Sequence, residues 1–360
     1  MKIDILIPVA EKGGCENIIN MLVPFLQRRC GYNIRVVQLI YEDTTWIHKD
    51  IAYYPLLQGR AGHNLEELVI TYKNFFCKDG APDVILATAW PFMCYVAKKA
   101  LAMISQENTF IFSWLHSPVK RYESAGFGSF PHLALADAHL AISHDIANEI
   151  TSVLPDATVI PVHNPVDFTA CKIPDDTSLQ NSLSIKNLYF IGRISAEKRL
   201  DLMIRALQGT ENNLKLFIIG DGEPALKEQL YALAEECGVT GSIEWLGWKN
   251  APWKHVYSPS AFLMASDYEG FPLTSIEALC NGIPVISTPV SGITDIIVPG
   301  VNGYLFPFND WQSLHQILLL LGNNQLPTID PIACQQSVLP HRMEDALLDF
   351  ADKIEACLHK

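Results

Sequence analysis

The chain has 360 residues, which is enough for two domains of ordinary size, each with its own hydrophobic core. Its formal net charge of −13 disfavours nucleic acid as a partner, and its nine cysteines include no C-x-x-C pair that would suggest a disulfide scaffold or a zinc site. No apolar run approaches a membrane span, and Asp4 interrupts the first apolar strand, so a signal peptide is not expected. Composition therefore predicts a soluble cytoplasmic protein, at most peripheral to a membrane.

The first predicted strand, at residues 3–8, is followed by a glycine pair and then by a helix whose apolar residues recur at helical spacing from 18 to 26. Gly13 and Gly14 let the backbone approach a phosphate or a sugar without a Cβ in the way. They are therefore candidate ligand-binding residues. The alternative is that the pair forms an ordinary turn.

A histidine follows another apolar strand, at residues 109–113. His116 lies at the end of that strand, where side chains reach the ligand crevice of a parallel sheet. It is either a functional residue or a loop histidine without a chemical role. Further along, Ser143 is expected to cap a helix that runs to Ile150.

Proline, serine and aspartate concentrate between residues 164 and 184, most densely at 173–178. Strand and helix patterns alternate on both sides of this stretch, and no repeat interrupts them. The sequence therefore predicts two α/β domains joined by a linker in this region.

A basic loop at residues 192–199 follows the apolar strand 188–191. Arg193 and Lys198 leave the strand end on the same loop, and a guanidinium fork with an ammonium group five residues on can clamp a diphosphate. The alternative is a charged surface loop in which Glu197 pairs locally.

The next strand, 216–219, precedes a motif that favours a different class of protein. Gly220, Gly222 and Ala225 fit the G-x-G-x-x-A dinucleotide fingerprint, and Glu244 follows at about the distance of a ribose-binding acid. An NAD-dependent oxidoreductase is therefore a rival interpretation. It places the motif on the second strand of its domain and leaves the basic loop without a function.

A strand at 259–266, a helix at 275–280 and a strand at 283–287 give the βαβ order of a parallel sheet. Glu269 and Glu277 lie on either side of the junction between the first strand and the helix. Two carboxylates at such a junction can hold two hydroxyl-rich parts of one ligand, which is what a nucleotide-sugar presents. The alternative is that both are solvated acids at a helix end.

The start of this helix is expected to be capped by Thr274 or Ser275. Both carboxylates would then project from the helix entrance, with its partly positive end toward the ligand.

With these motifs in place, the chain resembles the retaining glycosyltransferases of family four, which have the GT-B architecture of two facing Rossmann-like domains with an interdomain cleft. Glu269 with Glu277 and Arg193 with Lys198 carry the resemblance most specifically. It implies that the arginine and lysine hold the donor diphosphate, that Glu269 lies at the transferred sugar and that Glu277 binds the ribose hydroxyls. It also places His116 near the reacting sugar. Glu269, His116, Arg193 and Lys198 are the predicted catalytic residues.

The resemblance and the strand ends together add donor-binding candidates. The nucleotide base is expected to pack near the segment 245–248, at the end of another strand. Residues 164–167 resemble the family's Asn-Gly-Val-Asp turn, with Pro165 in place of the glycine. Besides the catalytic residues and Glu277, the predicted donor-binding residues are Gly13, Gly14, Gly247, Trp248, Gly270, Phe271, Pro272 and Leu273.

The resemblance also assigns the domains. Residues 1–168 would bind the acceptor, residues 169–342 would bind the donor, and a C-terminal helix at about 343–360 would pack back on the first domain. Two basic pairs in the first domain, Lys98-Lys99 and Lys120-Arg121, could contact an anionic glycolipid or the inner membrane surface. The alternative is that they are ordinary solvated residues.

The function implied is transfer of a hexose, galactose or glucose, from a UDP-sugar to a glycolipid or polysaccharide such as lipopolysaccharide core. The sequence has no D-x-D pair, so the reaction is expected to need neither a metal nor a cofactor, with Arg193 and Lys198 supplying positive charge. A non-catalytic module that binds a sugar nucleotide is the second alternative.

Overall fold

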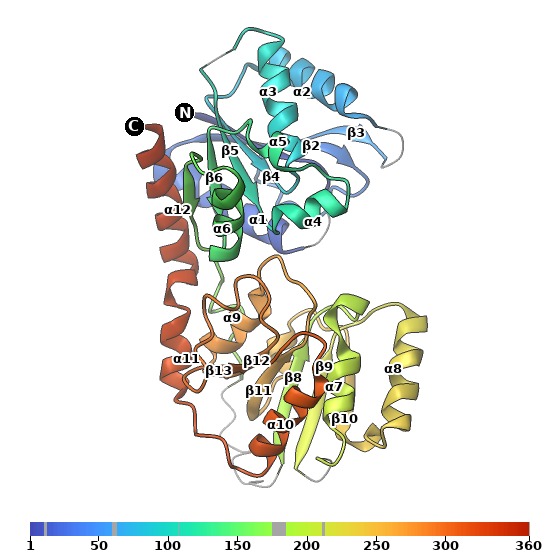
Figure 1. Cartoon of the computed structure of the whole chain (residues 1–360). Coiled ribbons are helices and arrows are strands. Elements are labelled where there is room, and N and C mark those ends of the chain that lie inside the picture. The colour runs from blue at the N-terminus through green and yellow to red at the C-terminus, as the bar shows by residue number, and fades with distance from the viewer. Residues whose placement is uncertain (11–12, 60–62, 107, 175–184, 211–212, 360) are drawn as a thin grey trace. The chain divides into compact units, whose positions relative to one another are not determined.

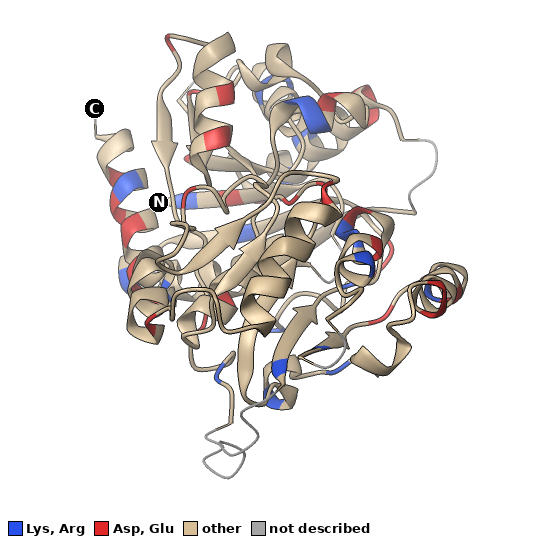
Figure 2. Cartoon of the chain, turned by 60° about the horizontal axis from the view of Figure 1, so that its bottom comes forward, with Lys and Arg blue, Asp and Glu red and all other residues tan. Residues whose placement is uncertain are grey.

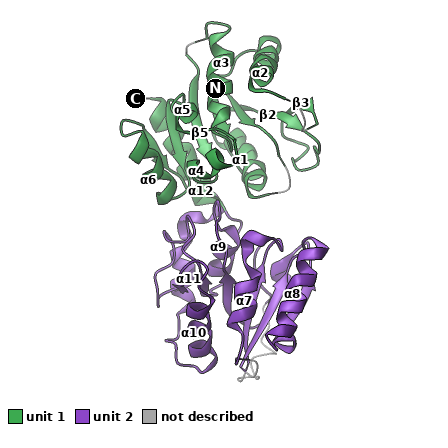
Figure 3. Ribbon diagram, turned by 45° about the vertical axis from the view of Figure 1, so that its right-hand side comes forward, with its two compact units in different colours: residues 1–165, 344–360 green, residues 166–343 purple. Residues whose placement is uncertain are grey.

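The structure, a computed structural model, describes residues 1–10, 13–59, 63–106, 108–174, 185–210 and 213–359 (Figure 1). It divides into two compact units, which Figure 3 shows in different colours. Unit 1 comprises residues 1–165 and 344–360, and unit 2 comprises residues 166–343. The sequence-based limits fall within three residues of these. Residues 175–184 of the predicted linker lie outside the described residues.

Unit 1 contains a seven-stranded sheet in the order β3-β2-β1-β4-β5-β6-β7, in which all neighbouring strands are parallel. Since parallel strands end at the same edge, the loops after them share one side of the sheet. The strands are β1 (Lys2–Ile7), β2 (Asn33–Tyr41), β3 (Tyr53–Gln58), β4 (Val84–Thr88), β5 (Phe110–Leu115), β6 (Ala138–Ala141) and β7 (Val159–Pro161). The helices are α1 (Gly14–Cys30), α2 (Leu65–Asp79), α3 (Phe92–Ala102), α4 (Val119–Ser124), α5 (Phe130–Leu133) and α6 (His144–Val153). Ser143 caps α6 by accepting from the Ile146 N–H, as predicted.

The C-terminal helix α12 (Met343–Leu358) packs on unit 1. The Phe350 ring lies 5.2 Å from the ring of Trp114 on β5, and Lys353 Nζ donates to the Pro161 carbonyl at 2.7 Å. The charged residues of this helix lie between its buried positions along the sequence. Figure 2 shows them in red and blue on the helix that ends at C. This helix therefore completes the hydrophobic core of unit 1.

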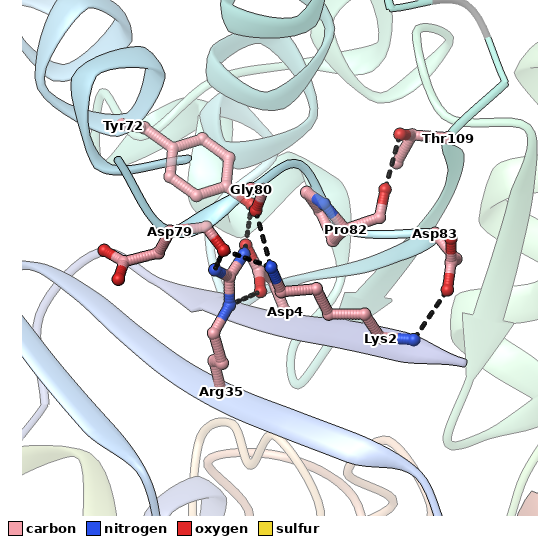
Figure 4. A network of polar contacts seen from close by, with 9 residues as sticks. All are labelled: Lys2, Asp4, Arg35, Tyr72, Asp79, Gly80, Pro82, Asp83 and Thr109. Carbon is pink, nitrogen blue, oxygen red and sulfur yellow. Dashed lines mark hydrogen bonds and ion pairs between the residues drawn. The ribbon is translucent and has the colours of Figure 1, made fainter. Parts of the chain in front are cut away.

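A buried polar network ties β1, β2 and α2 together (Figure 4). Arg35 on β2 donates two hydrogen bonds to the carboxylate of Asp4 on β1, at 2.7 and 2.8 Å, and the Tyr72 hydroxyl donates a third at 2.8 Å. Burial raises the pKa of Asp4, while the hydrogen bonds and charge of Arg35 act in the opposite direction. Asp4 is thus an acid with a buried cationic partner, which explains how it can interrupt an otherwise apolar strand.

Unit 2 contains a six-stranded parallel sheet in the order β10-β9-β8-β11-β12-β13. The strands are β8 (Lys186–Ile191), β9 (Leu214–Ile219), β10 (Ile243–Gly247), β11 (Pro259–Met264), β12 (Val285–Ser287) and β13 (Gly303–Leu305). The helices are α7 (Leu200–Ala206), α8 (Pro224–Glu236), α9 (Leu273–Cys280), α10 (Trp311–Gly322) and α11 (Pro331–Ser337).

The core of unit 2 lies on both faces of its sheet. Leu188 and Phe190 of β8 join a cluster with residues of α7, α8 and α10, whereas Tyr189 and Ile191 join another with residues of α9 and α11. Alternate residues of a strand point to opposite faces, so helices cover both sides of this sheet. The predicted α/β class with two parallel sheets is confirmed.

The two limits of unit 2 are paired with each other. The Val166 N–H donates to the His341 carbonyl at 2.8 Å, and the Met343 N–H donates to the Val166 carbonyl at 3.0 Å. Next to this bridge, Asp167 Oδ1 accepts from the backbone N–H groups of Thr169 and Ala170 and stabilises a local turn. The segment that resembles the family turn therefore forms the first crossing between the units.

Candidate functional site

An ion pair joins the two loops that the sequence singled out in unit 2. Lys198 ends a 3₁₀ turn after β8, and Glu269 lies in the loop after the neighbouring strand β11. Lys198 Nζ lies 2.6 Å from Glu269 Oε1, and Ser266 Oγ donates to the same oxygen at 2.7 Å. Both charged side chains are largely buried, with 21% and 14% of their surface exposed. A cation and a carboxylate are thus held together at the carboxyl edge of the sheet.

Arg199 also holds these two loops together. Its backbone is left-handed, with φ of 50°, and its guanidinium donates to Asp201 and Asp267 at 3.0 Å and also to Asn309. The Asp267 N–H donates to the Glu197 carbonyl at 2.8 Å. The loop that carries Lys198 is therefore fixed to the loop that carries Glu269 by main-chain and side-chain bonds.

Arg193 projects from the first of these loops into solvent. Its side chain is 73% exposed and lies 3.7 Å from Glu197 Oε1, an oxygen that accepts a shorter bond of 2.6 Å from Ser195. It lines a cavity of about 390 Å³ together with Gly220 and Trp248. Trp248 is 68% exposed and follows β10. The structure thus brings together the predicted diphosphate-binding arginine and the predicted base-binding tryptophan.

The glycines of the dinucleotide fingerprint have a structural explanation. A Cβ on Gly220 would lie 1.8 Å from the Gly192 carbonyl oxygen, and one on Gly222 would lie 1.9 Å from that of Ile194. Gly247, left-handed with φ of 68°, accepts a hydrogen bond from the Gly220 N–H. These glycines allow the loop after β9 to lie against the loop that carries Arg193. They therefore support the basic loop and need no dinucleotide to explain them.

Glu277 lies in the second turn of α9 and not at the helix entrance. Its Oε2 accepts a hydrogen bond from the Trp253 indole at 2.7 Å. Burial raises the pKa of Glu277, and the indole bond acts against this rise. Only part of its surface is exposed.

The predicted cap of this helix is wrong. The N-cap residue is Pro272, no side chain caps the helix, and Ser275 Oγ instead points to Met264 Sδ at 3.5 Å. Ser275 is buried, so packing against the sheet decides its orientation. The sequence pattern could not distinguish a capping serine from a buried one.

Two of the other predicted residues at the start of α9, Phe271 and Leu273, pack against the protein. The Phe271 ring lies 5.1 Å from that of His341, and a Cβ on Gly292 would lie 2.6 Å from Phe271 Cδ2. Phe271 and Leu273 both border the core cluster of α9 and α11. These two side chains of the segment from Gly270 to Leu273 are thus engaged in packing within the protein.

In unit 1, the predicted glycine pair starts α1. Gly13 is the N-cap residue and Gly14 the first residue of the helix. Cys15 follows them, and its Sγ lies 3.3 Å from His116 Nε2 and 3.5 Å from Thr88 Oγ1. The structure therefore brings the start of α1, the end of β4 and His116 together at one edge of the sheet.

The His116 imidazole and the Cys15 thiol are both uncharged at neutral pH. Burial lowers the pKa of His116 to about 4 and raises the pKa of Cys15 to about 12. His116 can thus act as a neutral hydrogen-bonding group, and it does not supply positive charge to a ligand.

The predicted basic pairs of unit 1 have neighbours within the unit. Lys98 Nζ lies 4.0 Å from the Asp137 carboxylate, and Lys99 Nζ lies 5.7 Å from the centroid of the Tyr95 ring. Lys120, which is exposed, lies on α4 with Arg121. Contact of these basic residues with an anionic surface stays a prediction.

The described residues contain neither a cluster of metal ligands nor a membrane-spanning helix. Within those ranges, no three His, Cys, Asp or Glu side chains lie together as metal ligands would. Among the helices described, none has the length and hydropathy needed to cross a bilayer.

Sequence reasoning missed four residues that build this site, namely Arg199, Trp253, Ser266 and Asp267. Arg199 is adjacent to Lys198 and Asp267 lies two residues before Glu269, so their positions in the two loops could have suggested a role. Trp253 contacts Glu277 from 24 residues away, and no local pattern marks that contact.

Comparisons with known proteins agree with this geometry. The family model for glycosyl transferases group 1 matches residues 179–330. The lipopolysaccharide 1,6-galactosyltransferase of Salmonella typhimurium is 33% identical over 274 residues, which cover 73% of this chain and 72% of that protein. The protein of the same name from Escherichia coli is 34% identical over 237 residues, which cover 64% of this chain and 62% of that protein.

A solved structure shows the same fold. The apo form of the lipopolysaccharide outer core galactosyltransferase WaaB superposes with a TM-score of 0.82 and 25% identity, covering 99% of this chain and all of that chain.

Proposed function

Because the chain belongs to the family of group 1 glycosyl transferases, with the GT-B fold, we propose that it transfers a hexose from a nucleoside-diphosphate sugar to a glycolipid or polysaccharide acceptor. The two relatives named as lipopolysaccharide 1,6-galactosyltransferases favour galactose as the hexose and lipopolysaccharide core as the acceptor. Glucose is the alternative hexose, and UDP is the proposed nucleotide. Retention of the anomeric configuration is proposed from the family resemblance.

The observation that carries this proposal is the ion pair between Lys198 and Glu269. It joins an ammonium group and a carboxylate on the loops after two neighbouring strands, and this supports a diphosphate bound beside a sugar. In an open α/β sheet, ligands bind at this edge. The dinucleotide-binding interpretation assigns no role to this ion pair, so the geometry favours a nucleotide-sugar as the ligand.

The charges also suit the chemistry of the leaving group. As the glycosidic bond breaks, negative charge grows on the diphosphate, and Arg193 lies exposed at the cavity where it can meet this charge. Glu277 has one oxygen bound to Trp253 and is proposed to accept ribose hydroxyls with the other. The neutral His116 is proposed to hydrogen-bond the reacting sugar.

We further propose that the enzyme works at the cytoplasmic face of the inner membrane, where a glycolipid acceptor is presented. The exposed Lys120 of unit 1 supports this proposal, because basic residues gain affinity for anionic lipid surfaces. Binding to vesicles of phosphatidylglycerol and phosphatidylethanolamine, compared at low and high salt, tests it.

The reaction is proposed to need no divalent metal. Lys198 and Arg193 supply the positive charge that a metal would otherwise bring to the diphosphate. We therefore expect transfer to continue in excess EDTA. Loss of activity in EDTA with recovery on adding Mg²⁺ or Mn²⁺ would show that the diphosphate-binding residues are wrongly assigned.

A donor screen tests the proposal as a whole. Purified protein is melted with UDP-, GDP-, ADP- and dTDP-sugars, since a ligand that binds the native state raises its Tm by mass action. UDP-galactose or UDP-glucose is expected to give the largest rise and to be hydrolysed slowly without acceptor. Stabilisation by NAD and by no sugar nucleotide would reverse the conclusion.

A further inference from the structure

Two aromatic rings of unit 1 form a stacked pair that the donor site does not use. The rings of Trp90 and Phe127 lie 4.2 Å apart and within 7° of parallel. Trp90 is partly exposed, and 36% of Phe127 is exposed. Trp90 follows β4, and Phe127 lies in the loop after α4. A partly exposed pair of aromatic rings offers an apolar surface on which a ligand can pack.

The backbone around the pair is constrained to hold it. Ala89 has a left-handed backbone, with φ of 65°, and its N–H donates to the Trp114 carbonyl at 3.2 Å. Gly128 has φ of 107°, and a Cβ there would lie 2.7 Å from the Phe92 backbone nitrogen. Only glycine therefore lets the loop lie close enough to α3 to place Phe127 over Trp90. A strained non-glycine residue beside such a contact is typical of a ligand site.

The same elements reach His116. Thr88, the last residue of β4, and His116 both contact Cys15 Sγ, at 3.5 and 3.3 Å. Tyr122 on α4 follows His116 by six residues, and its backbone carbonyl accepts from the Phe127 N–H at 2.8 Å. The ring pair and His116 therefore belong to one continuous edge of the unit 1 sheet.

We propose that Trp90 and Phe127 form the subsite on which a pyranose ring of the acceptor oligosaccharide stacks. One face of a pyranose carries mainly C–H groups, which pack on an aromatic face, while its hydroxyls remain at the rim for polar partners. Lys120 and Arg121 lie on α4, the helix that precedes Phe127, and suit an acceptor with phosphate or carboxylate groups. This inference rests on the proposed transferase function and names the residues that recognise its acceptor.

The test compares Trp90→Ala and Phe127→Ala with Trp90→Phe and Phe127→Tyr, which keep an aromatic face. Transfer from UDP-galactose to deacylated lipopolysaccharide core oligosaccharide gives the acceptor KM, and hydrolysis of UDP-galactose without acceptor gives the donor reaction alone. The alanine variants should raise the acceptor KM about five- to tenfold. The aromatic variants should keep the acceptor KM close to that of wild type. Donor hydrolysis and donor KM should stay within about twofold of wild type.

Phe110→Ala is the matched control. Phe110 is a partly exposed ring at the opposite, amino end of β5, where it pairs with Phe112 at 4.7 Å. Its loss should leave the acceptor KM unchanged. An unchanged acceptor KM in both Trp90→Ala and Phe127→Ala, or an equal loss of donor hydrolysis, would overturn the proposal.

A binding measurement separates this inference from the proposed reaction. Saturation transfer from protein aromatic protons to the core oligosaccharide needs no turnover. A signal in wild type that disappears in Trp90→Ala supports the subsite even if every donor fails. Transfer activity without such a signal, or a signal that persists in both alanine variants, would place the acceptor elsewhere.

Discussion

At the residue scale, the two glutamates are expected to differ in kinetics because their surroundings differ. Glu277→Gln keeps an oxygen for the Trp253 indole but loses the charge that ribose hydroxyls would bind, so donor KM should rise about tenfold. Glu269→Gln should mainly depress kcat, on the order of 10²-fold, because positive charge develops at the sugar in the transition state.

Calorimetry with UDP decides between these assignments. UDP carries the ribose and no sugar, so its affinity should fall in Glu277→Gln. It should hold or rise slightly in Glu269→Gln, because Lys198 loses its carboxylate partner and becomes more available to the diphosphate. Equal weakening in both variants would mean that the two roles are wrongly divided.

Arg193→Ala tests the cation at the cavity. With 73% of its side chain exposed, its removal should leave Tm nearly unchanged, while turnover at saturating donor falls on the order of 10² to 10³-fold. Lys254→Ala removes another exposed basic residue of unit 2 and should have no such effect. Normal turnover in Arg193→Ala would exclude this residue from the mechanism.

Much of this site could be predicted from single residues. The sequence predicts Lys198 as a cation for the diphosphate and Glu269 as a carboxylate for the sugar at two strand ends, and parallel pairing of β8 with β11 brings them into contact. The absence of a cap at Ser275 could not be predicted, because serine occurs both as a helix cap and as a buried residue. Here its side chain is buried against β11. The contact between Trp253 and Glu277 depends on how a distant turn packs, which no local spacing reveals.

At the element scale, Arg199 links the 3₁₀ turn after β8 to the loop after β11 at a position where glycine would be unstrained. Arg199→Gly loses the bonds to Asp201, Asp267 and Asn309 but relieves the left-handed backbone, whereas Arg199→Ala loses the bonds and keeps the strain. The alanine variant should therefore be less stable than the glycine variant by about 1 kcal/mol in urea unfolding.

Equal stability of the two variants would show that the backbone at residue 199 relaxes without cost. Both should also raise the donor KM relative to wild type, since Lys198 is the adjacent residue and loses its anchored loop.

Elements were easier to predict than their ends. The strand before Glu269 and the helix after it both exist, but the helix begins at Leu273, two residues earlier than expected. Its first turn has no capping side chain, so no sequence signal marks the start. In contrast, Ser143 caps α6 because its side chain faces the open first turn.

At the scale of the whole molecule, unit 1 depends on α12. The helix buries Leu347, Phe350 and Ile354, and burial of three such side chains is worth about 5 kcal/mol or more, comparable with the stability of a domain. Deleting residues 344–360 should therefore unfold unit 1 while unit 2 stays folded. Hydrogen exchange measured by mass spectrometry would show protection lost from β5 to β7 and retained in β8 and β9.

Phe350→Ala provides a milder control that keeps the helix, with an expected loss of about 3 to 5 kcal/mol. If the truncated protein keeps native protection in β5, the contact between Phe350 and Trp114 is not needed for folding of the unit.

The split of unit 1 between residues 1–165 and 344–360 also affects the order in which the two units can fold during synthesis. Domains usually fold in turn as they leave the ribosome, the N-terminal one first. Here the first 165 residues are synthesised without α12, whose buried residues complete their core, and all of unit 2 is synthesised before that helix. We therefore expect unit 2 to reach its final structure first and the nascent N-terminal half to depend longest on a holdase chaperone.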